Sequence, residues 1–384
     1  MVDAASQLGL FEPGPSLGED SEYYRRQIIT YIGNKRQLLE PIGQATAEVC
    51  AELGKEKLRI LDAFAGSGIV SRLFKSFASQ LVVNDMESYA RVVASCYLTN
   101  RAEVDGGELE SLVEKMNRVV DSGRVGEAGF IERLYSPADD QAIKPEERAF
   151  YTRDNARRLD QFRGLIGEQD PALFDLLLGP LLSAASVHAN TAGVFKGFYK
   201  DKETGAGKFG GSGSDALGRI MGQIQLRMPI LSQFDCEVDV RQADANDLVS
   251  DVGDFDLVYL DPPYNQHPYG SNYFMLNLLV DYCEPEDVSR VSGIPTDWNR
   301  SPYNQKRRSF ERLADLIARV DARYVLLSFN DEGFISPDEL RGLLAELGPV
   351  REVQLKHNTF RGSRNLRDRR THVTEHLFLL RKEG

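Results

Sequence analysis

The segment Asp261-Pro262-Pro263-Tyr264 follows an apolar run at 255–260 and combines groups that suit a flat, polar ligand. Each proline lacks a backbone N–H donor and fixes its own φ angle, which leaves carbonyls free to accept hydrogen bonds. We expect the Asp261 carboxylate and the Pro262 carbonyl to hold the two hydrogens of an exocyclic amine on a planar nucleic-acid base. The Tyr264 ring would stack on that base. An amine held in this way keeps more of its lone pair for attack on a methyl group.

A base inside a duplex reaches such a pocket only by leaving the base stack, which costs a few kcal/mol. Stacking on an aromatic ring returns roughly 1–3 kcal/mol of this. The same four residues could instead form a rigid turn with a surface tyrosine, so residues 261–264 do not decide the question alone.

A second segment that could bind a ligand is the glycine loop at 62–68, which follows a predicted strand and precedes a predicted helix. Glycines there let the backbone approach a ligand, and the helix N-terminus faces it. Asp85 ends the next predicted strand, where an acid can hold ribose hydroxyls. The G-x-G-x-x-G spacing is absent, and Asp62 would repel a pyrophosphate but suit a cationic amino group. A plain tight turn is the alternative, but beside residues 261–264 the loop favours an S-adenosylmethionine site over a nicotinamide dinucleotide site.

The elements that must position these residues alternate between strands and helices, which predicts an α/β fold with a Rossmann-like sheet. Strand-like runs occur at 57–64, 80–84, 236–241, 255–260, 324–328 and 377–380. Helical patterns occur at 69–76, 107–120, 146–167 and 171–189, and a Gly/Ser-rich loop at 205–218. The sequence therefore predicts a polar tail at 1–24, a catalytic domain formed by 25–100 and 236–384, and a mainly helical insertion at 101–235.

Composition sets further limits. The chain has 384 residues, 42% of them hydrophobic, and a net charge of −12, which excludes a disordered chain and a general nucleic-acid coat protein. Four scattered cysteines form no metal or disulfide pattern, and the first residues do not resemble a signal peptide, so we expect a cytoplasmic protein. No apolar run reaches 18 residues, which argues against a membrane span.

The histidines and cysteines of the chain bear on two other reaction classes, zinc-dependent chemistry and methylation through a cysteine nucleophile. His372 and His376 match the H-x-x-E-H zinc signature, but a strand there would separate them by roughly 13 Å, so we expect no metal. No cysteine lies in a nucleophile context, which argues against methylation of cytosine at C5.

Taken in order, these stretches resemble the D12 class of adenine-N6 DNA methyltransferases, in its α-arrangement. The resemblance covers most of residues 25–382 and includes the motifs at 31–36, 62–68, 84–85, 190–200, 242–245, 261–264, 269–273, 328–333 and 361–364. It implies a cofactor site for S-adenosylmethionine made by Tyr31, Gly33, Lys35, Asp62, Phe64, Ala65, Gly66, Gly68, Asp85, Asp244 and Asp261. Tyr31 and Lys35 would face the methionine end of the cofactor, Asp85 its ribose and Asp244 its adenine ring. Asp261, Pro262, Pro263 and Tyr264 would form the catalytic motif, and the 101–235 insertion the target-recognition region.

Candidate DNA contacts come from three places. A basic run at 351–382 contains Arg361, Arg364 and Arg367, which we expect to follow the phosphate backbone. Lys196 and Lys200 flank the glycine-rich loop, and Tyr269 and Asn272 follow the catalytic motif. A solvated charged surface remains the alternative for any single lysine or arginine.

We therefore predict methyl transfer from S-adenosylmethionine to N6 of a flipped adenine in double-stranded DNA, in a restriction-modification or related system. A cognate restriction endonuclease is the further partner that this reading allows. Three alternatives stay open: N4 of cytosine as the target, RNA in place of DNA, and a catalytically silent binding module. The recognition sequence and the oligomeric state do not follow from the sequence.

Overall fold

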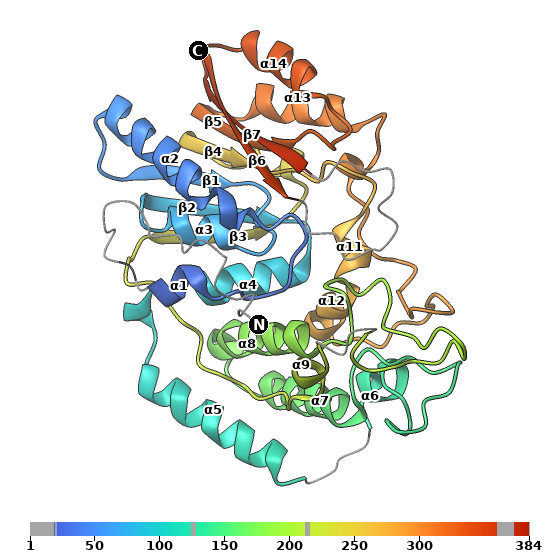
Figure 1. Cartoon of the computed structure of the whole chain (residues 1–384). Coiled ribbons are helices and arrows are strands. Elements are labelled where there is room, and N and C mark those ends of the chain that lie inside the picture. The colour runs from blue at the N-terminus through green and yellow to red at the C-terminus, as the bar shows by residue number, and fades with distance from the viewer. Residues whose placement is uncertain (1–18, 20, 124–127, 212–215, 359–371, 384) are drawn as a thin grey trace, which may run out of the picture.

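The computed structural model describes residues 19, 21–123, 128–211, 216–358 and 372–383. Within these residues one seven-stranded sheet has the order β3-β2-β1-β4-β5-β7-β6 (Figure 1). The strands are β1 (Leu58–Asp62), β2 (Ala78–Asp85), β3 (Glu237–Gln242), β4 (Phe255–Leu260), β5 (Ala322–Asn330), β6 (Val350–Asn358) and β7 (His372–Arg381). The first five pair in parallel, and β7 is antiparallel to both β5 and β6.

Each central strand buries both of its faces, and alternate residues enter two separate cores. Ile60, Leu257 and Leu326 point into one core, and their neighbours Leu61 and Val258 point into the other. This is the period of two that a pleated strand imposes, and it explains why these strands read as continuous apolar runs in the sequence. The predicted α/β class and the six predicted strand positions are confirmed to within a few residues.

Helices cover both faces of the sheet. One face is covered by α1 (Ser21–Arg25), η2 (Lys35–Leu38), α2 (Leu39–Leu53) and α3 (Ile69–Phe74). The other is covered by α10 (Ala245–Leu248), α13 (Ser309–Arg319) and α14 (Pro337–Ala345). Short 3-10 turns lie at η3 (Arg101–Glu103) and η4 (Pro302–Asn304). Local chemistry fixes some of these ends: Ser336 and Glu339 form a reciprocal capping box at the start of α14.

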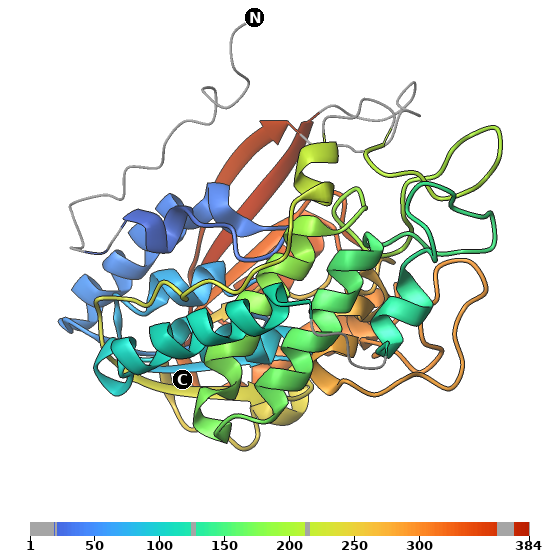
Figure 2. The ribbon, with the colours of Figure 1, turned by 90° about the horizontal axis from the view of Figure 1, so that it is seen from below.

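A third layer of helices lies beside the sheet, in the lower part of Figure 1, and Figure 2 shows it from below. It contains α4 (Ser88–Leu98), α5 (Gly106–Asp121), α6 (Phe130–Tyr135), α7 (Arg153–Gly167), α8 (Pro171–His188), α9 (Leu217–Met221), α11 (Tyr269–Asn272) and α12 (Phe274–Asp281). All of these helices except α9 contribute to one core, which includes Tyr89 of α4, Leu177 of α8 and Phe274 of α12. Helices from the predicted insertion therefore pack directly on helices that precede and follow it in the chain.

The predicted helix at 146–167 begins later than expected. The α7 helix starts at Arg153, where the Thr152 hydroxyl accepts the Asn155 N–H at 3.2 Å and caps the helix. Phe150 precedes this cap in a buried turn, and its N–H bonds the Tyr135 carbonyl at 3.0 Å. The apolar residues before Thr152 are buried by this turn and do not form a helical face.

The α8 helix is long and apolar enough to cross a membrane by those two criteria alone. Leu177, Leu178, Leu181 and Leu182 are nevertheless fully buried against other helices of the third layer. Such burial is typical of a core helix of a globular protein.

Candidate active site

The predicted motifs come together in a pocket at the carboxyl ends of the parallel strands. The strand order reverses between β1 and β4, and ligands of open α/β sheets bind at such a switch point. The predicted residues that line the pocket are Tyr31, Gly33, Lys35, Asp62, Phe64, Ala65, Gly66, Asp85, Asp244, Asp261, Pro263 and Tyr269. Of the other predicted residues, Gly68 begins α3 just beyond the loop, and Pro262 and Tyr264 adjoin Pro263.

The glycine loop approaches its neighbours too closely for a side chain. Gly66 has a φ of +52°, and a Cβ there would lie 2.8 Å from the Tyr31 hydroxyl. The Gly66 N–H donates to the Asp85 carboxylate at 2.8 Å, which joins the loop to the end of β2. Glycine at this position therefore follows from both its backbone conformation and the nearby tyrosine.

Asp62, at the end of β1, is a buried carboxylate with one unused oxygen. Its Oδ2 accepts the Ser71 hydroxyl at 2.5 Å, and its Oδ1 has no hydrogen-bond partner among the described residues. Burial raises the pKa of Asp62 to about 7, against the opposing effect of the Ser71 hydrogen bond. A cationic amino group in the pocket would satisfy the free oxygen and its charge.

Two further acids follow β2. Burial raises the pKa of Asp85, although its carboxylate accepts the N–H groups of Gly66 and Glu87. Burial raises the pKa of Glu87 to about 7, and the Asn277 amide, which donates to Glu87 Oε2 at 2.6 Å, acts in the opposite direction. Glu87 lines the pocket although the sequence analysis did not select it.

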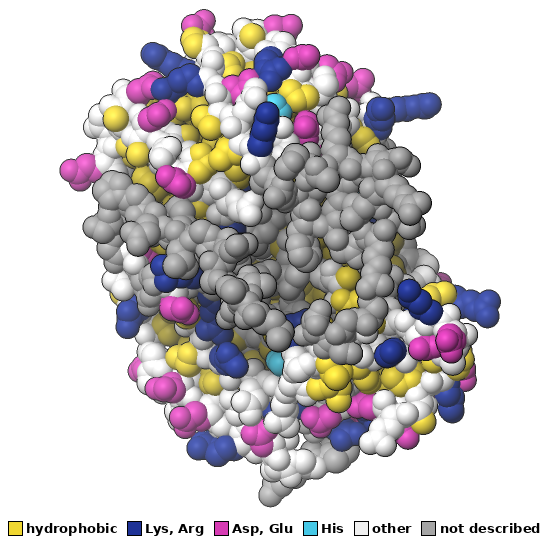
Figure 3. All heavy atoms as spheres, viewed as in Figure 1, with side chains coloured by type: hydrophobic (Ala, Val, Ile, Leu, Met, Phe, Trp, Pro, Cys, Tyr) yellow, Lys and Arg dark blue, Asp and Glu magenta, His cyan; other side chains and the backbone are white. Residues whose placement is uncertain are grey.

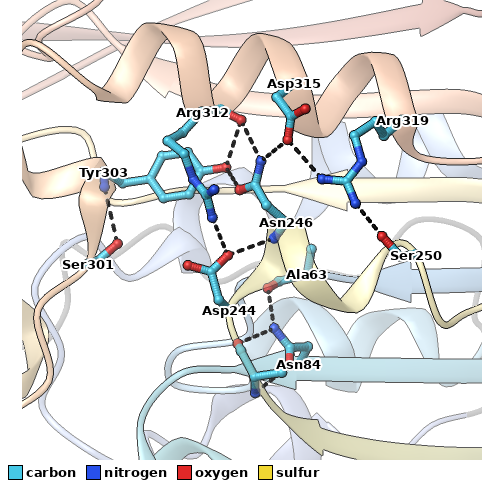
Figure 4. Close-up of polar contacts among 11 residues, drawn as sticks. Ala63, Asn84, Asp244, Asn246, Ser250, Ser301, Tyr303, Arg312, Asp315 and Arg319 are labelled. Atoms are coloured by element: carbon cyan, nitrogen blue, oxygen red, sulfur yellow. Dashed lines mark hydrogen bonds and ion pairs between the residues drawn. The ribbon is translucent and has the colours of Figure 1, made fainter.

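Asn84 joins three strand ends beneath the pocket, as Figure 4 shows. Its side-chain amide donates to the carbonyls of Ala63 and Ala243, each at 3.1 Å, and its oxygen accepts the Ala243 N–H at 3.0 Å. The adjacent Asp244 caps α10 by accepting the Asn246 N–H at 2.9 Å and pairs with Arg312 at 2.6 Å through the same oxygen. Asp244 is therefore held in place from two sides at the pocket wall.

Tyrosines from a distant segment fix the N-terminal motif. The Tyr31 ring stacks on Tyr273 and Tyr269, with ring centroids 4.9 and 5.1 Å apart. The Ile32 N–H donates to the Tyr273 hydroxyl at 2.7 Å, and the Tyr269 hydroxyl donates to the Ile32 carbonyl at 3.2 Å. Residues 31–33 are thus clamped across the pocket by the segment that follows the Asp-Pro-Pro-Tyr motif.

A cluster of three charged side chains is centred on Lys35. Its Nζ lies 3.1 Å from Asp261 Oδ1 and 3.5 Å from Glu375 Oε2, and only 4% of its side chain is exposed. Burial raises the pKa of Asp261 to about 6, with Lys35 lowering it and Glu375 raising it. Lys35 also lies 5.5 Å from the centre of the Tyr264 ring, which packs edge-on against Phe329.

The predicted DNA-contacting residues divide into three groups. Lys196 and Lys200 are exposed, and Asn190 anchors their segment by donating to the Ala149 and Lys208 carbonyls at 2.8 and 3.1 Å. The side chain of Asn272 is 3% exposed, and its carbonyl accepts the Phe195 N–H at 2.7 Å. The third group, Arg361, Arg364 and Arg367, lies outside the described residues.

The two ends of the predicted basic run serve the fold. Arg351 pairs with Glu48 at 3.1 Å and with Glu52 at 2.6 Å, both on α2. Lys382 donates to carbonyls at the end of α13. Arg351 and Lys382 are therefore engaged within the fold, and the expectation that Arg361, Arg364 and Arg367 follow a phosphate backbone stays a prediction. On the face drawn in Figure 3, acidic and basic side chains of the described residues are interspersed.

The two histidines of the zinc-like pattern lie on one strand. His372 and His376 lie in β7, as expected, and His376 Nδ1 is 2.7 Å from Glu352 Oε1 on β6. Among the described residues no group of three His, Cys, Asp or Glu side chains is arranged to hold a metal ion.

Comparison with known proteins agrees with this geometry. The family model of the D12 class N6 adenine-specific DNA methyltransferases matches residues 31–152 and 214–342. The type II methyltransferase M.NlaIII of Neisseria lactamica is 28% identical over 363 residues, which cover 92% of this chain and 99% of the relative. M.CviAII of Paramecium bursaria Chlorella virus 1 is 25% identical over 87% of this chain and 93% of the relative. M.FokI of Planomicrobium okeanokoites is 26% identical over 85% of this chain but only 50% of its own length.

The mixed seven-stranded sheet is consistent with a methyltransferase fold. Adenine and DNA, which the sequence analysis favoured over cytosine and RNA, are the base and nucleic acid of the matched family. Since the match covers well over half of the chain, the protein belongs to the D12 class of N6 adenine-specific DNA methyltransferases.

Proposed function

We propose that the protein is a type II modification enzyme that acts in the cytoplasm on a specific site in double-stranded DNA. It transfers the methyl group of S-adenosylmethionine to N6 of an adenine that has left the duplex. The observation that carries this proposal is the position of Asp261, which faces Lys35 inside the pocket that the glycine loop also lines. Two relatives named as type II methyltransferases match this chain over nearly their whole length. Their names support a restriction-modification context and a cognate endonuclease as partner.

The pocket has the features that S-adenosylmethionine requires. The unused, buried Asp62 Oδ1 suits its amino group, and the space against Gly66, which a Cβ would fill, suits close contact with the loop backbone. In this proposal Tyr31, Gly33, Lys35, Phe64 and Ala65 line the methionine end, with Gly68 shaping the loop. Asp85 holds the ribose and Asp244 the adenine ring. When bound, the cofactor supplies an electrophilic methyl group.

The residues of the chain then act on the amine. Asp261 and the Pro262 carbonyl accept its two hydrogens, which fixes the direction of the nitrogen lone pair. Tyr264 stacks on the flipped base, and Pro263 keeps the backbone rigid at this point. Catalysis in this scheme rests on alignment of the nitrogen with the methyl group, and such positioning can lower a barrier by roughly 7–11 kcal/mol.

The surroundings of the pocket are the proposed DNA surface. The insertion at 101–235 is the target-recognition region, and the exposed Lys196 and Lys200 lie in it. Tyr269 lines the pocket and donates a hydrogen bond to the Ile32 carbonyl, while Arg361, Arg364 and Arg367 contribute phosphate contacts. Asn272 acts from beneath this surface, since its carbonyl anchors the Phe195 segment.

Modification sequencing tests this function directly. A methylation-deficient bacterial host expresses the chain, and a parallel culture expresses Asp261→Ala as the control. The expected result is N6-methyladenine at one recurring DNA sequence, present only with the unaltered chain. Marks on cytosine would overturn the base, and an unmarked genome with a protein that binds S-adenosylmethionine would overturn the DNA substrate or require a partner.

A further inference from the structure

Glu375 is a buried carboxylate beside the pocket residue Lys35, and neither the sequence motifs nor the proposed function uses it. It lies on β7, and 8% of its side chain is exposed. Its Oε2 is 3.5 Å from Lys35 Nζ, which is also 3.1 Å from Asp261 Oδ1. Two carboxylates thus share one ammonium group, and this cluster of three carries a net charge of −1 when all are ionised.

The position of Glu375 is fixed by the sheet. In the antiparallel pairing of β5 with β7, Asn330 lies directly opposite Glu375. The Asn330 amide donates to Glu375 Oε1 at 3.4 Å, so one carboxylate oxygen faces Asn330 and the other faces Lys35. Next to this pair, the Asp331 N–H donates to the Thr374 carbonyl at 3.1 Å. Glu375 is therefore a rigid acceptor, set in a strand ladder.

A lysine paired with Asp261 alone would work against the proposed reaction. Charge-assisted hydrogen bonds in a buried site are strong, and an ammonium group that is fully engaged with one carboxylate occupies the acceptor that the amine needs. Glu375 competes for the same ammonium group. Burial lowers the pKa of Lys35, but Asp261 and Glu375 together raise it above its usual value, so the cation persists between them.

We propose that Glu375 is a positioning residue, which draws Lys35 partly away from Asp261 and leaves Asp261 able to accept the exocyclic amine. This inference rests on the proposed function. As the amine nitrogen bonds the methyl carbon, the methyl–sulfur bond breaks, the neutral thioether leaves, and the positive charge moves to the nitrogen. The same net negative charge stabilises this positive charge until the nitrogen gives one proton to the Asp261 carboxylate. Lys35 in turn keeps Asp261 in its ionised, accepting form.

The test is a pH profile of single-turnover methyl transfer by the full chain, with S-adenosylmethionine and duplex DNA that carries the site found by sequencing. Asp261 is faced by several titratable groups: Lys35 of η2, Glu375 of β7, Asp62 of β1, Tyr259 of β4, and Tyr264 and Tyr269 of the following segment. Asp62 titrates in the same range as Asp261, so variants are compared with the wild type over the whole profile.

For Glu375→Gln we expect the rate at pH 8 to fall by about 10-fold to 100-fold, the size typical of a lost orienting partner. Dissociation constants for S-adenosylmethionine and DNA should change by less than about threefold. Because a like charge is removed, Asp261 should ionise more readily, and the acid limb of the profile should move to lower pH by about one unit. A purely structural role lowers the rate at every pH and leaves the limb in place.

Glu352→Gln is the matched control, because Glu352 is a carboxylate of the neighbouring β6 whose partners Arg341 and His376 lie outside the pocket. It should leave both the rate and the limb unchanged. An unchanged limb in Glu375→Gln overturns the inference, whatever the rate. If Glu375→Gln fails to fold, Glu375→Asp takes its place. This variant should leave the acid limb of the pH profile where it is and lower the rate of methyl transfer. A wild-type rate or a shifted acid limb would overturn the inference. Failure of the wild type to methylate adenine would instead overturn the proposed function.

Discussion

The acids at the pocket and the acid Glu352 on the edge strand β6 have pKa values shifted in opposite directions. At the pocket, Asp261 and Glu375 share Lys35, and burial raises the pKa of Asp261 to about 6. On β6, Glu352 receives two hydrogen bonds from Arg341, at 2.8 and 2.9 Å, and chiefly for this reason its pKa falls to about 2.

The opposite pKa shifts come from the number of cations that face each acid and from burial. Glu352 has a bidentate arginine and a neighbouring His376, whereas Asp261 and Glu375 share one lysine. Among the described pocket residues, Asp62, Asp85 and Glu87 have hydrogen-bond donors but no close cation, and burial raises the pKa of each. The β6 carboxylate thus stabilises the fold, and the pocket carboxylates are kept at a cost to stability that a ligand can offset.

The largest expected effect comes from removing the central pocket acid. Asp261→Ala should lower single-turnover methyl transfer by about 1,000-fold or more, because the amine loses its charged acceptor. Affinity for S-adenosylmethionine, measured by calorimetry, should stay within about threefold of the wild type. Glu352→Ala, from the other group of acids, should transfer methyl groups at the wild-type rate. A fully active Asp261→Ala enzyme would mean that another group holds the amine.

A comparison of two glycines separates ligand binding from folding. Gly66→Ala places a Cβ 2.8 Å from the Tyr31 hydroxyl in a left-handed backbone conformation. Strain of this kind costs about 1–3 kcal/mol, so affinity for S-adenosylmethionine should fall by about 10-fold to 100-fold. Gly348→Ala, just before β6, places a Cβ 2.1 Å from the Arg381 carbonyl oxygen and should lower the melting temperature with no change in affinity. Equal loss of affinity in both variants would show that the effect is one of folding alone.

The two groups of acids should respond to pH with opposite signs. The pKa of Asp62 is raised in the folded state to about 7, so the folded protein binds more protons than the unfolded chain and loses stability as pH rises from about 4 to 7. Asp62→Asn should therefore be more stable than the wild type at pH 8, on the order of 2 kcal/mol, with the difference shrinking towards pH 4.

Glu352→Gln should do the reverse. The lowered pKa of Glu352 means that its stabilisation is present above about pH 4.5 and disappears as pH falls towards 2. This variant should be less stable than the wild type at pH 8 by about 1 kcal/mol and should match it in acid. Guanidinium unfolding at several pH values measures both variants, and shifts of the same sign would contradict the distinction between the two groups.

The smallest effects are expected where the pocket meets DNA. Lys200→Ala and Arg364→Ala should each weaken binding a few-fold and reduce the slope of log K against log salt by about 0.9, one phosphate contact each. Arg323→Ala is the control, because this exposed arginine lies at the start of β5, at the opposite end of the sheet from the pocket. Fluorescence anisotropy with a labelled duplex at several salt concentrations measures all three. An unchanged slope for Lys200→Ala would move the phosphate contacts away from its loop.

Much of the pocket could be predicted because its residues lie in short motifs next to recognisable strands. The apolar run of β4 leads directly into Asp261, and Asp85 ends β2 as expected. The strand β6 was missed because it carries Arg351, Glu352 and Lys356, the kind of charged side chains that protect the edge of a sheet. The same charges were read as part of a DNA surface.

Glu375 and Glu87 could not be selected in advance for a different reason. Glu375 comes next to the pocket residue Lys35 only through the antiparallel pairing of β5 with β7, which brings together opposite ends of the sequence. In the sequence it was visible only as the central acid of a zinc-like pattern between two histidines. Glu87 follows Asp85 by two residues, and its partner Asn277 lies on α12, which no motif connects to it. Long-range contacts of this kind leave no local signal.

The meeting of Lys35 and Glu375 has a consequence for the enzyme during its synthesis. Translation proceeds from the N-terminus, at roughly 5–20 residues per second in the cell. The glycine loop, Lys35 and Asp261 leave the ribosome before β7, and the cluster of three charges stays incomplete until Glu375 emerges. A chain that ends before β7 lacks Glu375 and also the strand that pairs with both β5 and β6, so neither the charge cluster nor the sheet is complete. If Glu375 acts as we propose, full methyl transfer requires a chain that extends through β7.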